Sequence, residues 1–517
     1  MTTAAYEVMI CAVLLTAFVL PLLLCHLHQP GYDHMRQLNW VRMIKANGNR
    51  FIHTVDNVIE CKDMNYPQLL HWMLSLFPFL WVKKYYCIFM ACVNVVNIVI
   101  YMMFLQGVHN QGWIEYSLHS FIFWGLIIYQ TTPFLYYIWN SKNSGLSARG
   151  FGLSIAHAYT YLVVLYICDP SYLMFGALCV CALTALMGSI FSFQFVLFTA
   201  LPISFFCDHW ELALLPPIGI VIFILIMPRV AMTYLRKQLD HKRIYYKYYA
   251  KVSILDYRFS IWRDLVYDIW IKKFPSLKER GYYIYKNPLI TLVIGFPVLT
   301  GYMVNIFINN NEVMNRGVMA LNSVVLGAFV VFIATSFRLT RFLGEPERYI
   351  EMVIPILSVI GLILLPQSYL TVIVAAGIIY TLMNLIFTVK MIGEYDTFNQ
   401  GVDELVEFVK SKHNIQHRVF ANNLHILPCF FDSNSDVLLP VPSFEYVFGY
   451  HITDVFPQQG GIIGENVLVP LSREAKINLF IYDRNRMTFS SETIKQLASL
   501  FEKIEEVNER FIVYSTD

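Results

Sequence analysis

The sequence contains little charge. Only 14% of its 517 residues are Asp, Glu, Lys or Arg, against roughly 25% in a typical soluble protein, and 57% are apolar. A soluble protein could not solvate such a composition, so the bilayer must be the solvent for most of the chain. The net charge is only +2, and this balance indicates no nucleic-acid partner.

The chain also lacks the usual signals for cofactors and metals. Its ten cysteines have no regular spacing, and only Cys429 stands well outside the apolar segments, so we expect neither a disulfide framework nor a metal site. The C-terminal part contains no phosphate loop, no Gly-rich dinucleotide turn and no paired-cysteine motif. No internal repeat is evident. The sequence therefore predicts no cofactor.

Long apolar runs are abundant instead. A membrane span needs roughly 20 apolar residues. The first run, 6–25, lacks a basic leader and a small-residue cleavage site, so it is typical of a retained anchor rather than a signal peptide. The runs predict about twelve spans, at 6–25, 67–82, 85–105, 116–138, 150–168, 171–188, 190–206, 211–228, 288–308, 317–336, 349–365 and 369–391.

Lysine and arginine predict the orientation, because cytoplasmic loops carry an excess of both. The insert 229–287 is rich in them, and Lys83, Lys84, Lys142 and Arg149 lie in two further loops. All three loops fall in the cytoplasm if the N-terminus does too, which places the first loop, 26–66, outside. That loop holds basic residues of its own, which argue the other way. The same parity places the tail after residue 391 in the cytoplasm.

Two helices are expected at the membrane surface. In the first loop, Met35, Leu38, Val41 and Ile44 recur every three residues, which predicts a short helix with its apolar stripe on lipid. A comparable helix is expected at 254–271. From about Gly393 the composition changes to that of a small soluble α/β domain, 392–517. Its predicted elements are a helix at 403–410, strands at 419–421 and 478–482, and a capped helix at 491–508.

Asp33 is the most informative polar residue, because it lies just past the first apolar run. One interpretation is an N-cap, whose side chain accepts from free N–H groups at the start of the interfacial helix. The other is a general base, with Arg36 one turn along facing a departing phosphate. The two roles do not exclude each other.

The arrangement of an apolar run, an acid, a short helix and Tyr66-Pro67-Gln68-Leu69 before the next run resembles the GT-C superfamily of membrane glycosyltransferases, over residues 1–391. The resemblance extends to 146–151, 192–195, 287–288 and 341–349. These enzymes use polyprenyl-phosphate-linked sugars, and bacterial surface-glycan and protein O-mannosyltransferase types are the members in question. Many members carry a second acid beside the first, but here His34 and Met35 follow Asp33, which does not support metal-dependent chemistry. A divalent metal stays an alternative, because Asp63 could approach from the far end of the loop.

The resemblance implies a mainly α-helical transmembrane bundle and a role for individual residues. Asp33 is the expected base. The expected substrate- and phosphate-binding residues are Arg36, Lys62, Asp63, Tyr66 and His71, with Arg348 added if the number of spans differs.

The resulting hypothesis is an inverting glycosyltransferase in a bacterial inner membrane. It transfers a sugar from a polyprenyl-phosphate donor to a hydroxyl of a glycan, lipid or protein acceptor on the exterior face, with membrane lipids as its other partners. The alternatives are a transporter or flippase of lipid-linked glycans, which internal repeats would favour, and a non-catalytic membrane scaffold.

Overall fold

The computed structural model divides the chain into two compact units, each built from three segments. Unit 1 comprises Met1–His28, Lys84–Ile226 and Tyr257–Ile392, and unit 2 comprises Gln29–Lys83, Met227–Asp256 and Gly393–Asp517. The structure describes residues 3–27, 32–60, 62–112, 116–136, 146–249, 287–308, 316–337, 340–412, 416–431, 435–438, 444–455, 463–485 and 489–516.

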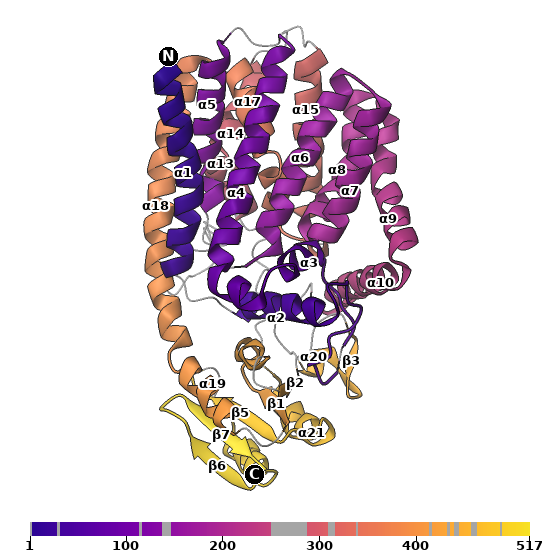
Figure 1. Ribbon diagram of the computed structural model, residues 1–517, viewed down its shortest axis with the longest axis vertical. Coiled ribbons are helices and arrows are strands. Elements are labelled where there is room, and N and C mark those ends of the chain that lie inside the picture. Colours follow the sequence, from indigo (N-terminus) through magenta and orange to yellow (C-terminus); the bar gives the residue numbers. More distant parts are fainter. Residues whose placement is uncertain are drawn as a thin grey trace, which may run out of the picture. The chain divides into compact units, whose positions relative to one another are not determined.

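Unit 1 is a bundle of apolar helices that lie side by side (Figure 1). They are α1 (Thr3–Leu27), α4 (Phe79–Asn110), α5 (Leu118–Gln130), η1 (Pro133–Tyr136), α6 (Ala148–Cys168), α7 (Tyr172–Gly188), α8 (Ile190–Cys207), η3 (Trp210–Leu214), α9 (Leu215–Ile226), α13 (Pro288–Gly295), α14 (Pro297–Ile308), α15 (Arg316–Thr335), η6 (Arg341–Leu343), α16 (Glu347–Glu351), α17 (Ile354–Leu364) and α18 (Gln367–Asn399).

The outer surface of this bundle is apolar. Met103 on α4, Phe205 on α8 and Leu225 on α9 are each at least 66% exposed, which would be costly in water and is expected in lipid. Five of the described helices, α1, α4, α6, α8 and α15, are long and apolar enough to cross a membrane, and several others are shorter apolar helices.

Twelve spans are not found among the described residues. The predicted span 67–82 is wrong: it breaks at 76–78, giving the short α3 (Leu69–Ser75) and then the start of α4. The predicted span 85–105 lies wholly inside α4. Pro78 explains the break, because it cannot donate the hydrogen bond that a continuous helix needs.

Unit 2 combines the first loop, helix α10 and the C-terminal segment. Its elements are α2 (Tyr32–Ala46), α3, α10 (Pro228–Ile244), η4 (Tyr245–Tyr249), α19 (Val402–Ser411), β1 (His417–Ala421), η7 (Leu424–Phe430), β2 (Ser435–Val437), β3 (Tyr446–Val447), β4 (Tyr450–His451), α20 (Ile452–Val455), α21 (Glu465–Glu474), β5 (Leu479–Asp483), α22 (Ser491–Ala498), β6 (Lys503–Glu506) and β7 (Phe511–Ser515). The predicted helix 254–271 lies outside the described residues.

Helix α2 is a core element of unit 2. Leu38, Val41 and Ile44 are at most 3% exposed, and the polar residues Gln37 and Asn39 on its other sides are buried as well. The helix packs against α3 and η7. The prediction that its apolar stripe lies on lipid is therefore wrong, because protein covers that stripe.

The C-terminal segment forms a five-stranded sheet of order β2-β1-β5-β7-β6, in which β1 is parallel to β2 and β5 while β7 is antiparallel to its neighbours. The predicted helix at 403–410 and the predicted strands are present as α19, β1 and β5. The predicted helix 491–508 is wrong in its second half. It ends at Ala498, and 503–506 forms β6 because pairing with β7 overrides the local helical pattern.

The predicted opposite faces for the first loop and the basic insert are also wrong. Lys237 of α10 forms a 3.2 Å ion pair with Asp63 of the first loop. The N–H of Val437 donates to the carbonyl of Asn57, 3.1 Å away, so the first loop also bonds to the C-terminal segment. Residues in direct contact cannot lie on opposite sides of a bilayer. The C-terminal segment therefore folds in contact with the first loop.

Candidate functional site

Three of the predicted site residues converge on one tryptophan that was not predicted. The Tyr66 ring stacks on Trp40 with centroids 4.7 Å apart, and the His71 ring meets the edge of Trp40 at 5.2 Å. The Arg36 guanidinium lies 5.0 Å from the centre of the same indole ring, a distance at which a cation is attracted by the ring face. We call Arg36, Gln37, Trp40, Tyr66 and His71 the Trp40 cluster.

Local hydrogen bonds hold this cluster in shape. Gln68, between Tyr66 and His71, accepts from the Ile52 N–H at 2.8 Å and donates to the Ile52 carbonyl at 2.7 Å. Lys45, at the end of α2, donates to the carbonyl of Ser75, the last residue of α3, at 2.8 Å and to that of Phe77, just beyond it, at 2.9 Å. The chain between Asn65 and Ser75 is thus fixed against both α2 and the first loop.

His71 is a neutral, fully buried member of the Trp40 cluster. Its Nε2 bonds to Oε1 of Gln37, and because a carbonyl oxygen only accepts, Nε2 carries the hydrogen. Burial lowers the pKa of His71 to about 3, although the nearby Pro67 carbonyl favours the protonated form. At neutral pH His71 therefore supplies hydrogen bonding and packing rather than positive charge.

This buried histidine predicts that acid weakens the fold. Below pH 6.5 an exposed histidine in the unfolded chain binds a proton, whereas folded His71 does not until about pH 3. Above pH 6.5 His71 makes its full contribution to the free energy of unfolding. This contribution decreases as the pH falls and is about 2 kcal/mol smaller at pH 5. The measurement is the free energy of unfolding in urea of the detergent-solubilised protein at pH 7 and at pH 5. Between these two pH values, this free energy should fall by about 2 kcal/mol less in His71→Gln than in the unsubstituted chain. Equal losses would contradict the prediction.

The other predicted residues of the first loop are not in the cluster. Lys62 is exposed, and Asp63 pairs with Lys237. Asp33 is the second described residue of α2, and its role as an N-cap stays a prediction. Its backbone lies three and four residues before Arg36 and Gln37, which places all three on one side of the helix.

Gln37 and Trp40 were missed because no motif includes them. Their spacing could have indicated them. Asp33, Gln37 and Trp40 recur at intervals of four and three residues, which places them on one face of a helix.

Arg348 belongs to a second, separate group within unit 1. Its Nε lies 2.8 Å from Glu345 Oε2 and its Nη1 3.0 Å from Glu351 Oε2. The Arg348 and Glu351 side chains are only 6% and 5% exposed. Arg348 is thus paired with both carboxylates, and sequence reasoning did not single out Glu351. Breaking such a buried pair costs about 3–5 kcal/mol.

A line of polar residues continues from this ion pair into the bundle. The Glu351 carbonyl lies 3.4 Å from Nε2 of His157 on α6, and Nδ1 of that ring lies 3.1 Å from Oδ1 of Asn97 on α4. Asn97 then donates to the Tyr129 hydroxyl of α5 at 2.9 Å. Buried polar side chains among apolar helices are costly unless they bond to one another. These residues therefore join α4, α5 and α6 to the end of α16.

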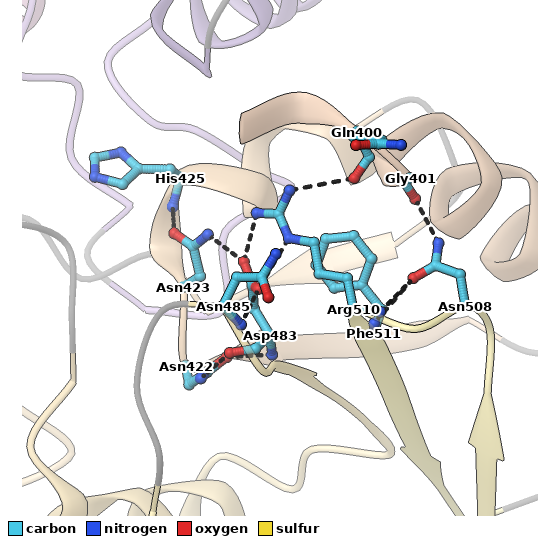
Figure 2. Close-up of polar contacts among 10 residues, drawn as sticks. All are labelled: Gln400, Gly401, Asn422, Asn423, His425, Asp483, Asn485, Asn508, Arg510 and Phe511. Carbon is cyan, nitrogen blue, oxygen red and sulfur yellow. Dashed lines mark hydrogen bonds and ion pairs between the residues drawn. The ribbon is translucent and has the colours of Figure 1, made fainter. Parts of the chain in front are cut away.

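The carboxyl ends of β1 and β5 are a third position to consider, because ligands of open α/β sheets bind where the strand order reverses. Figure 2 shows that polar groups of unit 2 fill this position themselves. Asp483, fully buried, accepts from Arg510 at 2.9 and 2.7 Å and from Asn423 at 2.8 Å, and Asn422 bonds to the Asp483 backbone. The cluster joins β1, β5 and β7, and we assign it a structural role.

Within the described part of the chain, no group of three or more His, Cys, Asp or Glu side chains is arranged to hold a metal ion. No family model matches the sequence, and no curated protein matches it.

Among solved structures, the chain is similar to an oligosaccharyltransferase from Archaeoglobus fulgidus that was crystallised with a tethered acceptor peptide containing the NVT sequon. The TM-score is 0.44 at 10% identity, over 92% of this chain and 69% of that one. Both values are too low to assign a fold family or an activity.

Proposed function

We propose that this protein is a membrane glycosyltransferase that transfers a sugar from a polyprenyl-phosphate donor to a hydroxyl of a glycan, lipid or protein acceptor. The observation that carries the proposal is the Trp40 cluster. It brings Arg36, Tyr66 and His71 together beside the helix turn that contains Asp33. These are residues to which the GT-C resemblance, drawn from sequence, assigns substrate contacts.

In the proposed reaction the acceptor hydroxyl gives its proton to the Asp33 carboxylate, and its oxygen bonds to the anomeric carbon of the sugar. The bond from that carbon to the phosphate oxygen breaks, and the electron pair leaves with polyprenyl phosphate. Attack opposite the leaving group inverts the anomeric centre.

Arg36 is the residue we assign to the leaving phosphate. Among the described residues it forms no ion pair, and a cation–π contact with the Trp40 ring holds it in position. A guanidinium can donate two parallel hydrogen bonds to one phosphate. Lys62 is exposed and has a weaker claim to this role, while Asp63 is engaged with Lys237.

The proposal predicts that Arg36→Ala weakens donor binding and turnover together. Loss of one charge-assisted contact, about 1.5–3 kcal/mol, corresponds to about 10- to 150-fold in kcat/KM. The measurement is the initial rate of sugar transfer against donor concentration in membranes. Arg50→Ala is the matched control, since it removes the same charge from an exposed position of the same loop. If the initial rate depends on donor concentration in Arg36→Ala as it does in the unsubstituted chain, Arg36 does not bind the phosphate.

A transporter of lipid-linked glycans is the second candidate, and one observation favours it. The buried pair of Arg348 and Glu351 places charge among apolar helices, where ionisable residues often line a transport path. The two candidates differ in chemistry: a transporter moves the donor intact, whereas the transferase releases polyprenyl phosphate. Mass analysis of lipid products after incubation with donor and acceptor separates them.

A further inference from the structure

Helix α10 has two faces of different chemistry. One packs within unit 2: Ala231 and Tyr234 are at most 3% exposed, and the Lys237 Nζ atom lies 3.9 Å from the centre of the Phe444 ring. The opposite face is exposed, and its residues, spaced three or four apart, alternate between arginine and an apolar or aromatic side chain. We call this set the α10 stripe: Arg229, Met232, Arg236, Leu239 and Arg243 of α10, with Tyr246 of η4, which directly follows it.

The composition of the α10 stripe fits a lipid surface. Met232, Leu239 and Tyr246 are 56%, 72% and 50% exposed, so apolar area that water disfavours lies along the whole helix. Arginines separate these residues, and their long stems let the charge reach a phosphate while apolar neighbours enter the layer below. The α10 stripe contains no acid. Asp240 instead lies 3.8 Å from Lys237, toward the packed face.

The chain itself holds α10 near a bilayer. The apolar helix α9 ends at Ile226, and α10 begins two residues later at Pro228. Met227 between them has a φ of −137° and a ψ of 65°, which ends one helix and lets the next take a new direction. Pro228 suits the first position of a helix because its missing N–H is not needed there.

We propose that α10 lies on the bilayer surface, with its arginines on the phosphates of anionic phospholipid headgroups and its apolar residues in the headgroup–acyl boundary. The bilayer itself is the partner. This inference does not depend on glycosyl transfer, because no α10 stripe residue belongs to the Trp40 cluster.

The experiment uses the full chain with a photo-crosslinking amino acid at Leu239, in vesicles of equal parts phosphatidylcholine and phosphatidylglycerol. Lys495, exposed on α22 in the C-terminal segment, is the matched control position. After illumination, intact-mass analysis should find phospholipid adducts at Leu239 at least tenfold more often than at Lys495. Equal yields at the two positions, or adducts to protein alone, would overturn the proposal.

Headgroup preference is read from the same adducts. One basic residue near an anionic surface raises the local concentration of anionic lipid about fivefold. Adducts of phosphatidylglycerol should therefore exceed those of phosphatidylcholine at least fivefold. Replacing Arg229, Arg236 and Arg243 by Gln should bring this ratio close to one. The control replaces Arg473, Lys495 and Lys503 by Gln, an equal loss of charge from exposed positions elsewhere in unit 2, and should leave it unchanged. A ratio near one with all arginines present would overturn the assignment to anionic headgroups.

Discussion

Asp33→Asn is expected to lower the rate of sugar transfer by about 10²–10⁴-fold, the usual cost of removing a general base. Asparagine has nearly the size of aspartate but cannot accept the proton of the acceptor hydroxyl. Asp33 is the second described residue of α2, and an acid in the first turn of a helix generally interacts favourably with the helix dipole. That interaction is worth about 0.3–1 kcal/mol, so Asp33→Asn should fold nearly as well as the unsubstituted chain while losing its activity.

The measurement has two stages. Intact-mass comparison of the lipid-linked and surface glycans of cells with and without the gene identifies the product, and its initial rate is then followed in membranes. Asp33→Ala should be no less active than Asp33→Asn if the proton acceptor is what matters. Asp56→Asn, an exposed acid of the same loop, is the matched control and should keep full activity. A folded Asp33→Asn protein with normal turnover would end the assignment of Asp33 as base.

Cysteines introduced at Asn47 and at Lys247 should react with a membrane-impermeant thiol reagent from the same side of the membrane. The segments that carry them are both part of unit 2, where Lys237 and Gln238 of α10 bond to Asp63 and Asn65 of the first loop. Between the two segments the chain forms α4, α5, α6, α7, α8 and α9. If each crosses the membrane once, their even number returns the chain to the side it left.

The distribution of charge predicts which side this is. Connections at the other ends of these helices, 111–117, 169–171 and 208–214, contain no Lys or Arg but four acids. The first loop, the insert and the residues beside Lys83 are basic, so the positive-inside tendency places them together in the cytoplasm. The basic first loop is then no longer an exception. If α1 crosses the membrane once, this prediction places the N-terminus outside, opposite to the orientation expected from sequence.

The labelling is done in a chain without native cysteines. Neither position should react in intact cells, and both should react after permeabilisation. Reaction at both positions in intact cells would keep the packing of unit 2 but place it on the exterior face, as the GT-C resemblance implies. Reaction at only one position would contradict the packing itself.

The sequence alone determined the features that depend on near neighbours in the chain. Its apolar runs predicted a helical membrane bundle, because a residue's preference for lipid needs no partner. The pattern at 403–410 predicted α19, and the short apolar runs predicted β1 and β5, because period and composition are local properties.

Tertiary structure decided everything that required a distant partner. An apolar stripe such as that of Leu38, Val41 and Ile44 can be covered by lipid or by protein, and only the fold shows that protein covers it. Residues 503–506 became a strand because β7 was there to pair with them.

The candidate site depended on the fold in the same way. Asp33, Arg36, Tyr66 and His71 were visible as polar or aromatic residues near an apolar run, but Trp40, which joins the last three, carried no motif. Arg348 was visible too, whereas its buried partner Glu351 was not singled out. The side of the membrane on which each loop lies depended on the fold as well. Counting spans assigns that side from every predicted span, so one wrong span reverses it. By contrast, the ion pair between Lys237 and Asp63 places their two segments on the same side.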